Sequence, residues 1–264
     1  MDNFLIDIVS DLHIEQWNNK YSTKYPCGKI NNLPYNFEDK KGSILIVAGD
    51  TSDDIDLTLE YLNNISSKYE KILFIDGNHE HVNKYPNLYT IEEINSKVIS
   101  LNNHKLIYLP SNDYIYKNTL FIGVCGWWNY NDRNDINENL NYFDNWIPHF
   151  TEKDNLNFID NVIKRCKNET KYIKDTLFKY KDYDNIKNII IITHTLPINI
   201  FSTINDKYLN LGTDINSELN ILQLQKINNK ISHYIFGHTH QKHNENLNNI
   251  KIICNPRGRP EDYD

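Results

Sequence analysis

The chain of 264 residues has no apolar run long enough to cross a bilayer. Its N-terminus enters an apolar segment at Phe4 and lacks the basic and long apolar regions of a secretory signal. The four cysteines have no CxxC spacing, which many zinc and redox motifs use, and Cys125 and Cys254 end apolar runs. These absences predict a cytoplasmic protein with reduced, buried thiols and no membrane contact.

Glycine and proline are also scarce, with 9 and 8 residues, and neither gathers in a linker. No segment of the chain repeats. We therefore expect one domain over residues 1–264, which is long enough for a substantial core. Arginine is rare, and the formal net charge is −7. This charge disfavours a broad electrostatic surface for nucleic acid, although metal ions in a cavity could still supply positive charge.

Apolar runs rich in β-branched residues predict buried strands, and each run ends in a short polar cluster. The runs are Phe4–Val9, Ile44–Ala48, Ile72–Ile75, Ile189–Ile192 and Ile231–Phe236. The clusters that follow them are Asp11-Leu12-His13, Gly49-Asp50, Gly77-Asn78-His79-Glu80, Thr193-His194 and Gly237-His238-Thr239-His240. Open α/β sheets bind ligands at the carboxyl ends of their strands, so we expect these clusters to converge.

Further elements are expected between these strands. Asp53 or Asp54 would cap a helix that runs to about Tyr69. Residues 129–183 are polar, charged and aromatic with helical periodicity, which predicts a helical insertion between two halves of the sheet structure. The other expected elements are helices near 90–98 and 217–226, short strands at 106–109, 114–116 and 120–125, and a hairpin over 242–254 that turns at Asn248-Asn249.

The polar clusters contain side chains that bind transition metals. Asp11 and His13 lie two residues apart and can therefore face one cation. The two oxygens of Asp50 can bridge two ions, and His238 and His240 again lie two residues apart after a buried strand. Each cluster alone is typical of an ordinary turn. Together they hold five of the ten histidines in a coherent order, which predicts a site for two divalent ions suited to attack on phosphorus.

This series of motifs resembles the calcineurin-like metallophosphoesterase superfamily, and the resemblance covers residues 11–240. Two further stretches, Gly123–Trp128 and Cys254–Gly258, resemble small, poorly characterised members found in bacteria, phages and viruses. The resemblance implies an α/β fold, a four-layer αββα sandwich in which two mixed β-sheets are flanked by helices. It also implies a metal-dependent hydrolase of phosphoric esters.

The resemblance implies a role for each motif residue. Asp11, His13 and His240 would hold one metal, Asn78, His194 and His238 the second, and Asp50 would bridge both. Mn²⁺ is the first choice, with Fe, Zn²⁺ or Ni²⁺ as alternatives, because a mixed set of nitrogen and oxygen ligands suits those ions. Metal-activated hydroxide would attack the phosphorus, and His79 would donate a proton to the leaving group. His79 could instead serve only as a fixed imidazolium against the phosphoryl oxygens.

The chain departs from some branches of the superfamily. Asp54 and Asp76 stand where the protein Ser/Thr phosphatases carry phosphate-binding arginines, which disfavours a phosphoprotein substrate. Asp11 is retained, whereas lariat-debranching relatives have cysteine there, and Thr195 replaces the second histidine of a Thr-His-His motif. The preferred substrate class is therefore a phosphodiester or a small phosphorylated metabolite such as a nucleotide.

Several residues outside the ligand set are further candidates. His81 would line the substrate pocket or lie on the surface, and Asp53 would orient His79 through a carboxylate–imidazole pair unless it caps the helix. Arg257 and Arg259 would bind phosphate or close the C-terminal turn. Trp127 and Trp128 would stack on a base or be buried under the helical insertion.

Two other functions stay open. The first is a nuclease acting on RNA or DNA, against which the acidic net charge weighs only lightly. The second, from a different class, is a catalytically silent, metal-binding interaction scaffold. Scaffolds of this kind lose the catalytic histidine or several ligands, whereas His79 and every ligand position are present here. No protein partner is predicted from the sequence.

Overall fold

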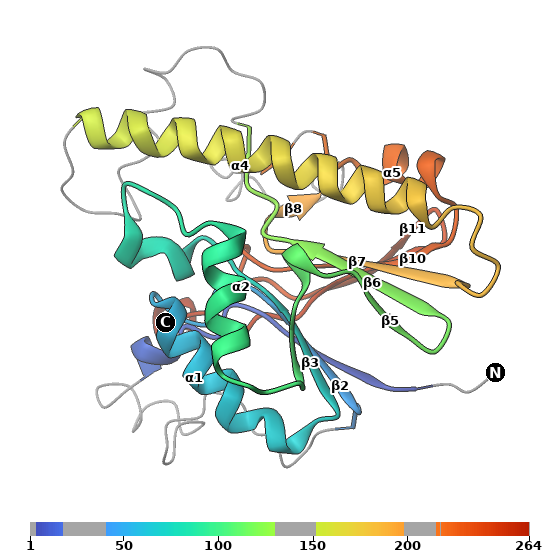
Figure 1. Ribbon diagram of the computed structural model, residues 1–264, viewed down its shortest axis with the longest axis horizontal. Coiled ribbons are helices and arrows are strands. Elements are labelled where there is room, and N and C mark those ends of the chain that lie inside the picture. The colour runs from blue at the N-terminus through green and yellow to red at the C-terminus, as the bar shows by residue number, and fades with distance from the viewer. Residues whose placement is uncertain (1–3, 18–40, 130–151, 198–214, 217, 264) are drawn as a thin grey trace.

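Two β-sheets pack face to face and are covered on their outer faces by helices in the computed structural model, which describes residues 4–17, 41–129, 152–197, 215–216 and 218–263 (Figure 1). The first sheet has four strands in the order β1-β2-β3-β4, and every pairing in it is parallel. Its strands are β1 (Ile6–Val9), β2 (Ile44–Ala48), β3 (Lys71–Ile75) and β4 (Leu106–Tyr108).

The second sheet has six strands and is mixed. Its order is β11-β12-β10-β7-β6-β5, with antiparallel pairing only at the two edges. The strands are β5 (Tyr114–Tyr116), β6 (Thr119–Val124), β7 (Asn188–Thr193), β10 (Ile231–Phe236), β11 (His243–Leu247) and β12 (Ile250–Cys254). A separate two-stranded sheet pairs β8 (Leu196–Pro197) with β9 (Ile215–Asn216).

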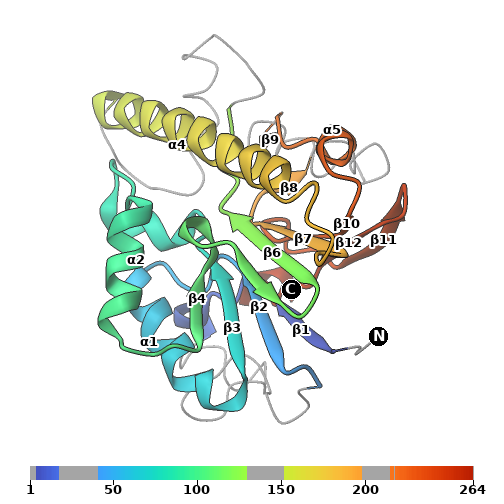
Figure 2. The ribbon, with the colours of Figure 1, turned by 45° about the vertical axis from the view of Figure 1, so that its right-hand side comes forward.

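Helices cover both sheets, as the turned view shows (Figure 2). Helices α1 (Ile55–Ile65) and α2 (Ile91–Ser100) share a hydrophobic cluster with the four-stranded sheet. Helices α4 (Glu152–Lys179) and α5 (Ile221–Ile227) cover the six-stranded sheet. Short 3₁₀ turns lie at η1 (Ile14–Trp17), η4 (Ser66–Lys68), η5 (His79–Lys84), η6 (Leu109–Ser111) and η10 (Pro260–Tyr263).

The side-chain alternation of β2 shows how one strand serves two core layers. Ile44, Ile46 and Ala48 lie in the layer between the sheets, whereas Leu45 and Val47 lie in the layer under α1 and α2. A strand that is buried on both faces needs the continuous apolar run seen in the sequence. The predicted αββα fold is confirmed, except that only the six-stranded sheet is mixed, since every pairing in the four-stranded sheet is parallel.

Most predicted elements lie where the pattern placed them. The 242–254 hairpin turns through Asn248 and Asn249 at φ of 49° and 67°, the left-handed conformation that a tight hairpin requires. The helix expected near 217–226 begins only at Ile221, because Asn220 is its N-cap. Helix α4 falls within the predicted insertion, but residues 130–151 lie outside the described residues. The single domain stays a prediction.

Cys125, Cys166 and Cys254 are free and buried, as expected for reduced thiols, and Cys27 lies outside the described residues. Within the described ranges, no helix combines the length and the apolar character that a membrane span requires.

Candidate metal centre

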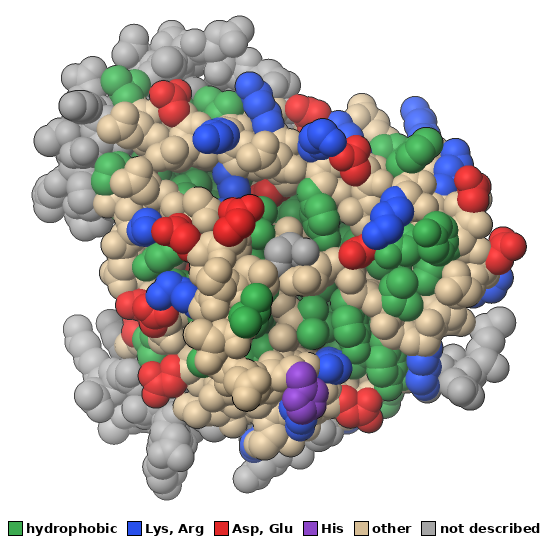
Figure 3. Space-filling view, in the orientation of Figure 1, with side chains coloured by type: hydrophobic (Ala, Val, Ile, Leu, Met, Phe, Trp, Pro, Cys, Tyr) green, Lys and Arg blue, Asp and Glu red, His purple; other side chains and the backbone are tan. Residues whose placement is uncertain are grey.

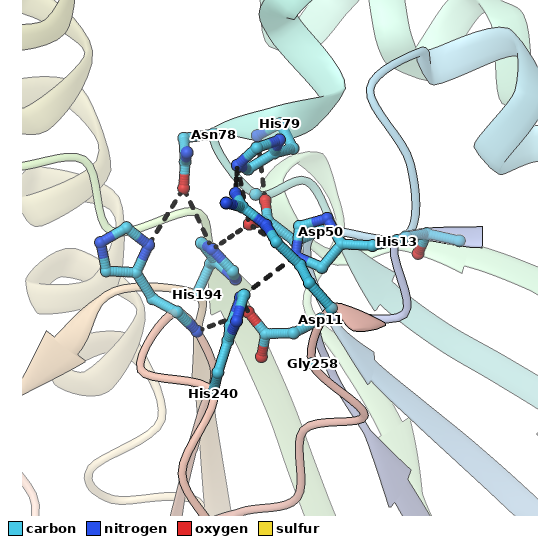
Figure 4. Close-up of polar contacts among 12 residues, drawn as sticks. Asp11, His13, Asp50, Asn78, His79, His194, His240 and Gly258 are labelled. Carbon is cyan, nitrogen blue, oxygen red and sulfur yellow. Dashed lines mark hydrogen bonds and ion pairs between the residues drawn. The ribbon is translucent and has the colours of Figure 1, made fainter. Parts of the chain in front are cut away.

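The polar clusters that follow β1, β2, β3, β7 and β10 meet at one end of the two sheets (Figure 4). Five of their side chains sit on left-handed backbone: Asp11 at φ 51°, His13 at 42°, Asp50 at 53°, His238 at 70° and His240 at 52°. Residues with a Cβ avoid this region, at a cost of roughly 1–3 kcal/mol each, and such strain gathers at functional sites. The left-handed residues turn the chain sharply after each strand. As a result, Asp11 and His13 face the same centre, and so do His238 and His240.

Two glycines let the backbone pass close to the clustered side chains. A Cβ on Gly77 would lie 2.1 Å from Oδ1 of Asp50, and one on Gly49, which has a φ of 79°, would lie 2.6 Å from Nδ1 of His194. Both contacts are far too short for real atoms, so the glycines of the Gly-Asp and Gly-Asn-His-Glu motifs are required by packing.

Asp11, His13 and His240 form the first group of potential ligands. The Nε2 atoms of His13 and His240 face each other at 3.1 Å, and Nε2 of His240 lies 3.5 Å from Oδ1 of Asp11. Oδ1 of Asp11 also accepts a hydrogen bond from the backbone N–H of His238, while Oδ2 is buried with no hydrogen-bond partner among the described residues. A buried carboxylate oxygen and two opposed imidazole nitrogens are groups that one cation would satisfy together.

Asn78, His194 and His238 form the second group. Oδ1 of Asn78 lies 3.1 Å from Nε2 of His194 and 3.1 Å from Nδ1 of His238. Nδ1 of His194 lies 2.9 Å from the carbonyl oxygen of Ala48, an arrangement in which Nδ1 carries the proton and Nε2 faces the centre.

Asp50 lies between the two groups, completely buried. Its Oδ2 is 3.1 Å from Nε2 of His194 and 3.9 Å from Nε2 of His13. Although burial opposes protonation of His194, the Asp50 carboxylate raises the pKa of that imidazole to about 10. The negative charge of Asp50 thus favours positive charge at the centre. A proton and a metal ion compete for the same ligand atoms, so a site that favours protons also favours metal ions. This set of imidazole, carboxylate and amide donors fits two divalent ions with Asp50 between them.

His79 lies beside this centre and is held from two sides. Its Nδ1 is 2.6 Å from Oδ1 of Asp53, and its backbone N–H donates to Oδ1 of Asp50. The next residue, Asp54, is the N-cap of α1 and accepts hydrogen bonds from its first turn. Burial lowers the pKa of His79, but the Asp50 and Asp53 carboxylates outweigh it and the pKa is raised overall.

Glu80 joins two of the motif loops. Its buried carboxylate accepts hydrogen bonds from the backbone N–H groups of Asp50, Thr51 and Gly77 at 2.6–3.1 Å. Burial and then the nearby Asp50 raise the pKa of Glu80 to about 7. The fourth residue of the Gly-Asn-His-Glu motif therefore holds the Asp50 and Asn78 loops in register.

Replacing Glu80 by glutamine is expected to destabilise the fold by about 1–3 kcal/mol, because an amide N–H₂ group would then point at backbone donors. Glu93, an exposed carboxylate that forms the capping box of α2, provides the matched control. Glu93→Gln should change stability by only about 0.5 kcal/mol, since glutamine also serves in a capping box. Urea unfolding of the three proteins measures the difference, and equal stability of both variants would contradict the role given to Glu80.

Three residues predicted to contact the substrate have packing or polar partners within the protein. His81 is buried, with Nε2 2.8 Å from Asp76 and Nδ1 accepting from the backbone N–H of Tyr89, so it neither lines an open pocket nor lies on the surface. Trp128 is buried in a cluster with residues of α4, its ring 6.2 Å from that of His238. The Arg257 guanidinium lies 3.8 Å from the centre of the Trp17 ring. The sequence could not show these contacts, because they form only when distant segments pack together in the folded chain.

Other residues at the site had no signal in the sequence. Oδ2 of Asp262 lies 2.6 Å from Nδ1 of the ligand candidate His240. Both carboxylate oxygens of Glu15 are buried without a hydrogen-bond partner in the described part of the chain, and burial, then Asp53, raise the pKa of Glu15 to about 7. Glu15 lies two residues after His13 on the one-turn helix η1, a spacing that is common in any turn.

A buried ion network lies behind the His79 loop. Arg165 of α4 donates from Nε to Glu169 at 2.7 Å and from Nη2 to Asp76 at 3.0 Å, and Glu169 in turn accepts from the backbone N–H of Gly126 at 2.8 Å. Although burial favours the neutral acid, the Arg165 guanidinium holds the pKa of Asp76 well below its usual range. Asp76 is therefore the buried ion-pair partner of a residue of α4.

The chain is similar to proteins of one family. A family model described as calcineurin-like phosphoesterase matches residues 4–242. Uncharacterized protein L509 of Acanthamoeba polyphaga mimivirus is 28% identical over 269 residues, which cover 96% of this chain and 91% of the viral protein.

Solved structures of low sequence identity share the fold. Phosphopantetheinyl hydrolase from Mycobacterium tuberculosis superposes with a TM-score of 0.64 at 13% identity, over 98% of this chain and 90% of its own. A dimetal phosphatase from Danio rerio gives 0.52 at 12% identity, with the same coverage of 98% and 90%. A putative 5′-nucleotidase from Staphylococcus aureus gives 0.53 at 14% identity, over 96% of this chain but 48% of that protein.

The matched region, residues 4–242, spans every strand-end motif, and the solved structures share the fold at TM-scores of 0.52–0.64. The chain therefore belongs to the calcineurin-like phosphoesterase family and is a metal-dependent phosphoric ester hydrolase with a dinuclear metal centre.

Proposed function

We propose that this phosphoesterase hydrolyses a phosphodiester or a small phosphorylated substrate such as a nucleotide. The observation that carries the proposal is the placement of Asp50 between two groups of ligand candidates, with His79 directly beside it. The residues that would hold the first ion are Asp11, His13 and His240, those for the second are Asn78, His194 and His238, and Asp50 serves both. Mn²⁺ is the proposed metal, with Fe, Zn²⁺ or Ni²⁺ as alternatives.

Two bound divalent ions supply an activated water and neutralise the charge that builds on the phosphoryl oxygens. His79 lies where it could donate the proton that the leaving oxygen needs. Asp53 holds Nδ1, so that Nε2 is the nitrogen that points toward the centre, 3.9 Å from Oδ2 of Asp50. The two carboxylates near His79 favour its protonated form, which is the form that donates.

A small substrate is favoured over nucleic acid by the formal net charge of −7. On the face shown in Figure 3, basic side chains are interspersed with acidic ones. Two structural relatives, a phosphopantetheinyl hydrolase and a putative 5′-nucleotidase, also point to small phosphorylated compounds. A nuclease with a short recognition surface is the second candidate.

Hydrolysis assays with Mn²⁺ test the proposal. We expect turnover of bis-p-nitrophenyl phosphate or of a small phosphate ester, and its loss in Asp50→Asn. The substrates to compare are a nucleoside monophosphate, a cyclic nucleotide, a linear diester and a short RNA. Cleavage of the RNA alone would favour the nuclease, and no turnover of any ester with any of the four metals would favour the silent scaffold.

Metal binding itself is expected to stabilise the fold. Mn²⁺ at one hundred times its dissociation constant should stabilise the protein by about 2.7 kcal/mol, because it binds only the folded chain. Thermal unfolding with and without Mn²⁺ measures this shift. Asp50→Asn should remove most of it, whereas Asp184→Asn, at an exposed aspartate, should keep it. A full shift in Asp50→Asn would show that the ions bind elsewhere.

A further inference from the structure

The C-terminal segment 255–263 is built onto the candidate metal centre. The backbone N–H of Gly258 donates to the carbonyl oxygen of Asp11 at 2.9 Å, and the backbone N–H of Arg257 donates to that of Ser10 at 3.0 Å. Nε1 of Trp17 donates to the carbonyl oxygen of Gly258 at 3.1 Å. Figure 4 shows Gly258 beside Asp11. The segment is thus held to the first ligand loop by two backbone hydrogen bonds and to η1 by one hydrogen bond from the Trp17 side chain.

The two arginines of this segment have different surroundings. Arg257 packs on Trp17, as described above. Arg259 reaches the centre, where its Nη2 lies 2.7 Å from Nε2 of His79. Its Nε is buried and has no hydrogen-bond partner within the described ranges. A guanidinium has five N–H donors in a planar fork, so Arg259 presents unused donors beside the proposed ligands of two metals.

Asp262 sets the position of Arg259. Its Oδ2 accepts from the backbone N–H of Arg259 at 2.5 Å and lies 2.6 Å from Nδ1 of His240. Gly258 permits this turn, because it has a φ of 81° and a Cβ there would lie 2.7 Å from Oδ2 of Asp262. One carboxylate therefore connects the arginine loop to a ligand of the first metal.

We propose that Arg259 binds a phosphoryl oxygen of the substrate and that Asp262 is the residue that positions it. This inference rests on the proposed function and adds to it the cation that the motif loops lack, since Asp54 caps a helix and Asp76 pairs with Arg165. A guanidinium only donates, so Nε2 of His79 accepts from Arg259 in this structure. A phosphoryl oxygen that took over the Arg259 donor would free Nε2 to carry a proton, and the leaving oxygen of that phosphoryl group would lie close to His79. Charge-assisted hydrogen bonds from a planar fork suit the tetrahedral phosphate anion.

Binding of inorganic phosphate to the Mn²⁺-loaded protein tests the inference by calorimetry. We expect Arg259→Ala to weaken phosphate binding about 10- to 100-fold, the loss expected for a hydrogen bond to a charged group. Arg259→Lys should recover part of the affinity, because a point charge replaces the fork. The matched control is Arg257→Lys, which keeps a cation on Trp17 and should bind phosphate within about two-fold of the parent.

Kinetics separate a substrate contact from a structural role. With the best substrate of the parent, Arg259→Ala should raise KM and the inhibition constant of phosphate, and Asp262→Asn should do so to a smaller degree at saturating Mn²⁺. Thermal melts show whether each variant is folded. If Arg259→Ala is unfolded, the same kinetic comparison is made with Arg259→Lys.

The possible failures are distinguishable. Unchanged phosphate affinity and KM in both Arg259 variants, in an active parent, would overturn the inference and leave the proposed function standing. A parent that hydrolyses no ester but binds phosphate through Arg259 would overturn the proposed function alone. A Mn²⁺-loaded parent that binds no phosphate would overturn the inference.

Discussion

Replacing His79 by glutamine lowers kcat by about 10²–10⁴-fold for a diester with a poorly stabilised alkoxide leaving group, which is the loss expected for a general acid. The physical reason is that such an oxygen cannot leave without a proton, and His79 Nε2 faces the centre while Asp53 holds Nδ1. For a p-nitrophenyl leaving group, which departs as a stable anion, the same substitution should cost much less. Steady-state kinetics with both leaving groups measure this contrast.

The leaving-group contrast separates the two roles that His79 could have. A fixed imidazolium that only neutralises phosphoryl oxygens would be needed equally for both leaving groups. Equal losses in kcat would therefore contradict proton donation and favour the electrostatic role.

The pH profile gives an independent check through Asp53. An acid must be protonated to act, so activity should fall as the pH rises through the pKa of His79. Because Asp53 helps to raise that pKa, Asp53→Asn should move the alkaline limb to lower pH and reduce activity about 10- to 100-fold. Asp54→Asn is the matched control, since asparagine also caps helices and Asp54 does not contact His79. An unmoved alkaline limb in Asp53→Asn would show that the limb belongs to another group.

Replacing Arg165 by methionine is expected to destabilise the fold by about 3–5 kcal/mol, because it leaves two buried carboxyl groups without their cation. Asp76 and Glu169 have side chains that are 0% exposed, and Arg165 bonds to both. Burial raises the pKa of Glu169 to about 7 even in the intact network, since one guanidinium serves two carboxyl groups. Urea unfolding near pH 8 measures the loss.

Lys171→Met is the control for Arg165→Met. Lys171 forms an ion pair with Asp175 on the same helix, but their side chains are 76% and 64% exposed. Such a pair contributes little, so the change should stay within about 0.5 kcal/mol. The difference in unfolding free energy between the parent and Arg165→Met should narrow on acidification. The lowered pKa of Asp76 contributes its full stability above the unfolded value of 3.8, and this contribution is lost as the pH falls from there toward the folded value. A difference in unfolding free energy between the parent and Arg165→Met of less than about 1 kcal/mol near pH 8 would show that the network is not needed for stability.

The network also explains why the helical insertion matters to the site. Asp76 directly precedes the Gly77-Asn78-His79 loop, so Arg165 connects α4 to the residues that carry the chemistry. A partly unfolded α4 in Arg165→Met would therefore reduce activity as well as stability. The amino-acid sequence contained no sign of this pairing, since 89 residues separate Arg165 from Asp76.

The sequence alone determined the order of the strands' polar ends, and with it the family and the composition of the candidate centre. It could do so because a buried strand leaves a continuous apolar run, and because the carboxyl ends of parallel strands meet at one edge whatever lies between them. Asp11, Asp50 and His194 stand out by their place after such runs, and the resemblance to the family implied which metal each would hold. The four-layer αββα sandwich was implied by the resemblance to the family.

Only the tertiary structure decided between neighbouring residues of similar chemistry. Asp53 faces His79 while Asp54 caps α1, and Arg259 reaches the centre while Arg257 packs on Trp17. Each choice depends on the direction of one side chain and on a partner far away along the chain. The sequence shows which residue types follow each strand. The contacts that orient their side chains form only when distant segments pack together, so the tertiary structure decides which side chains lie beside the metals.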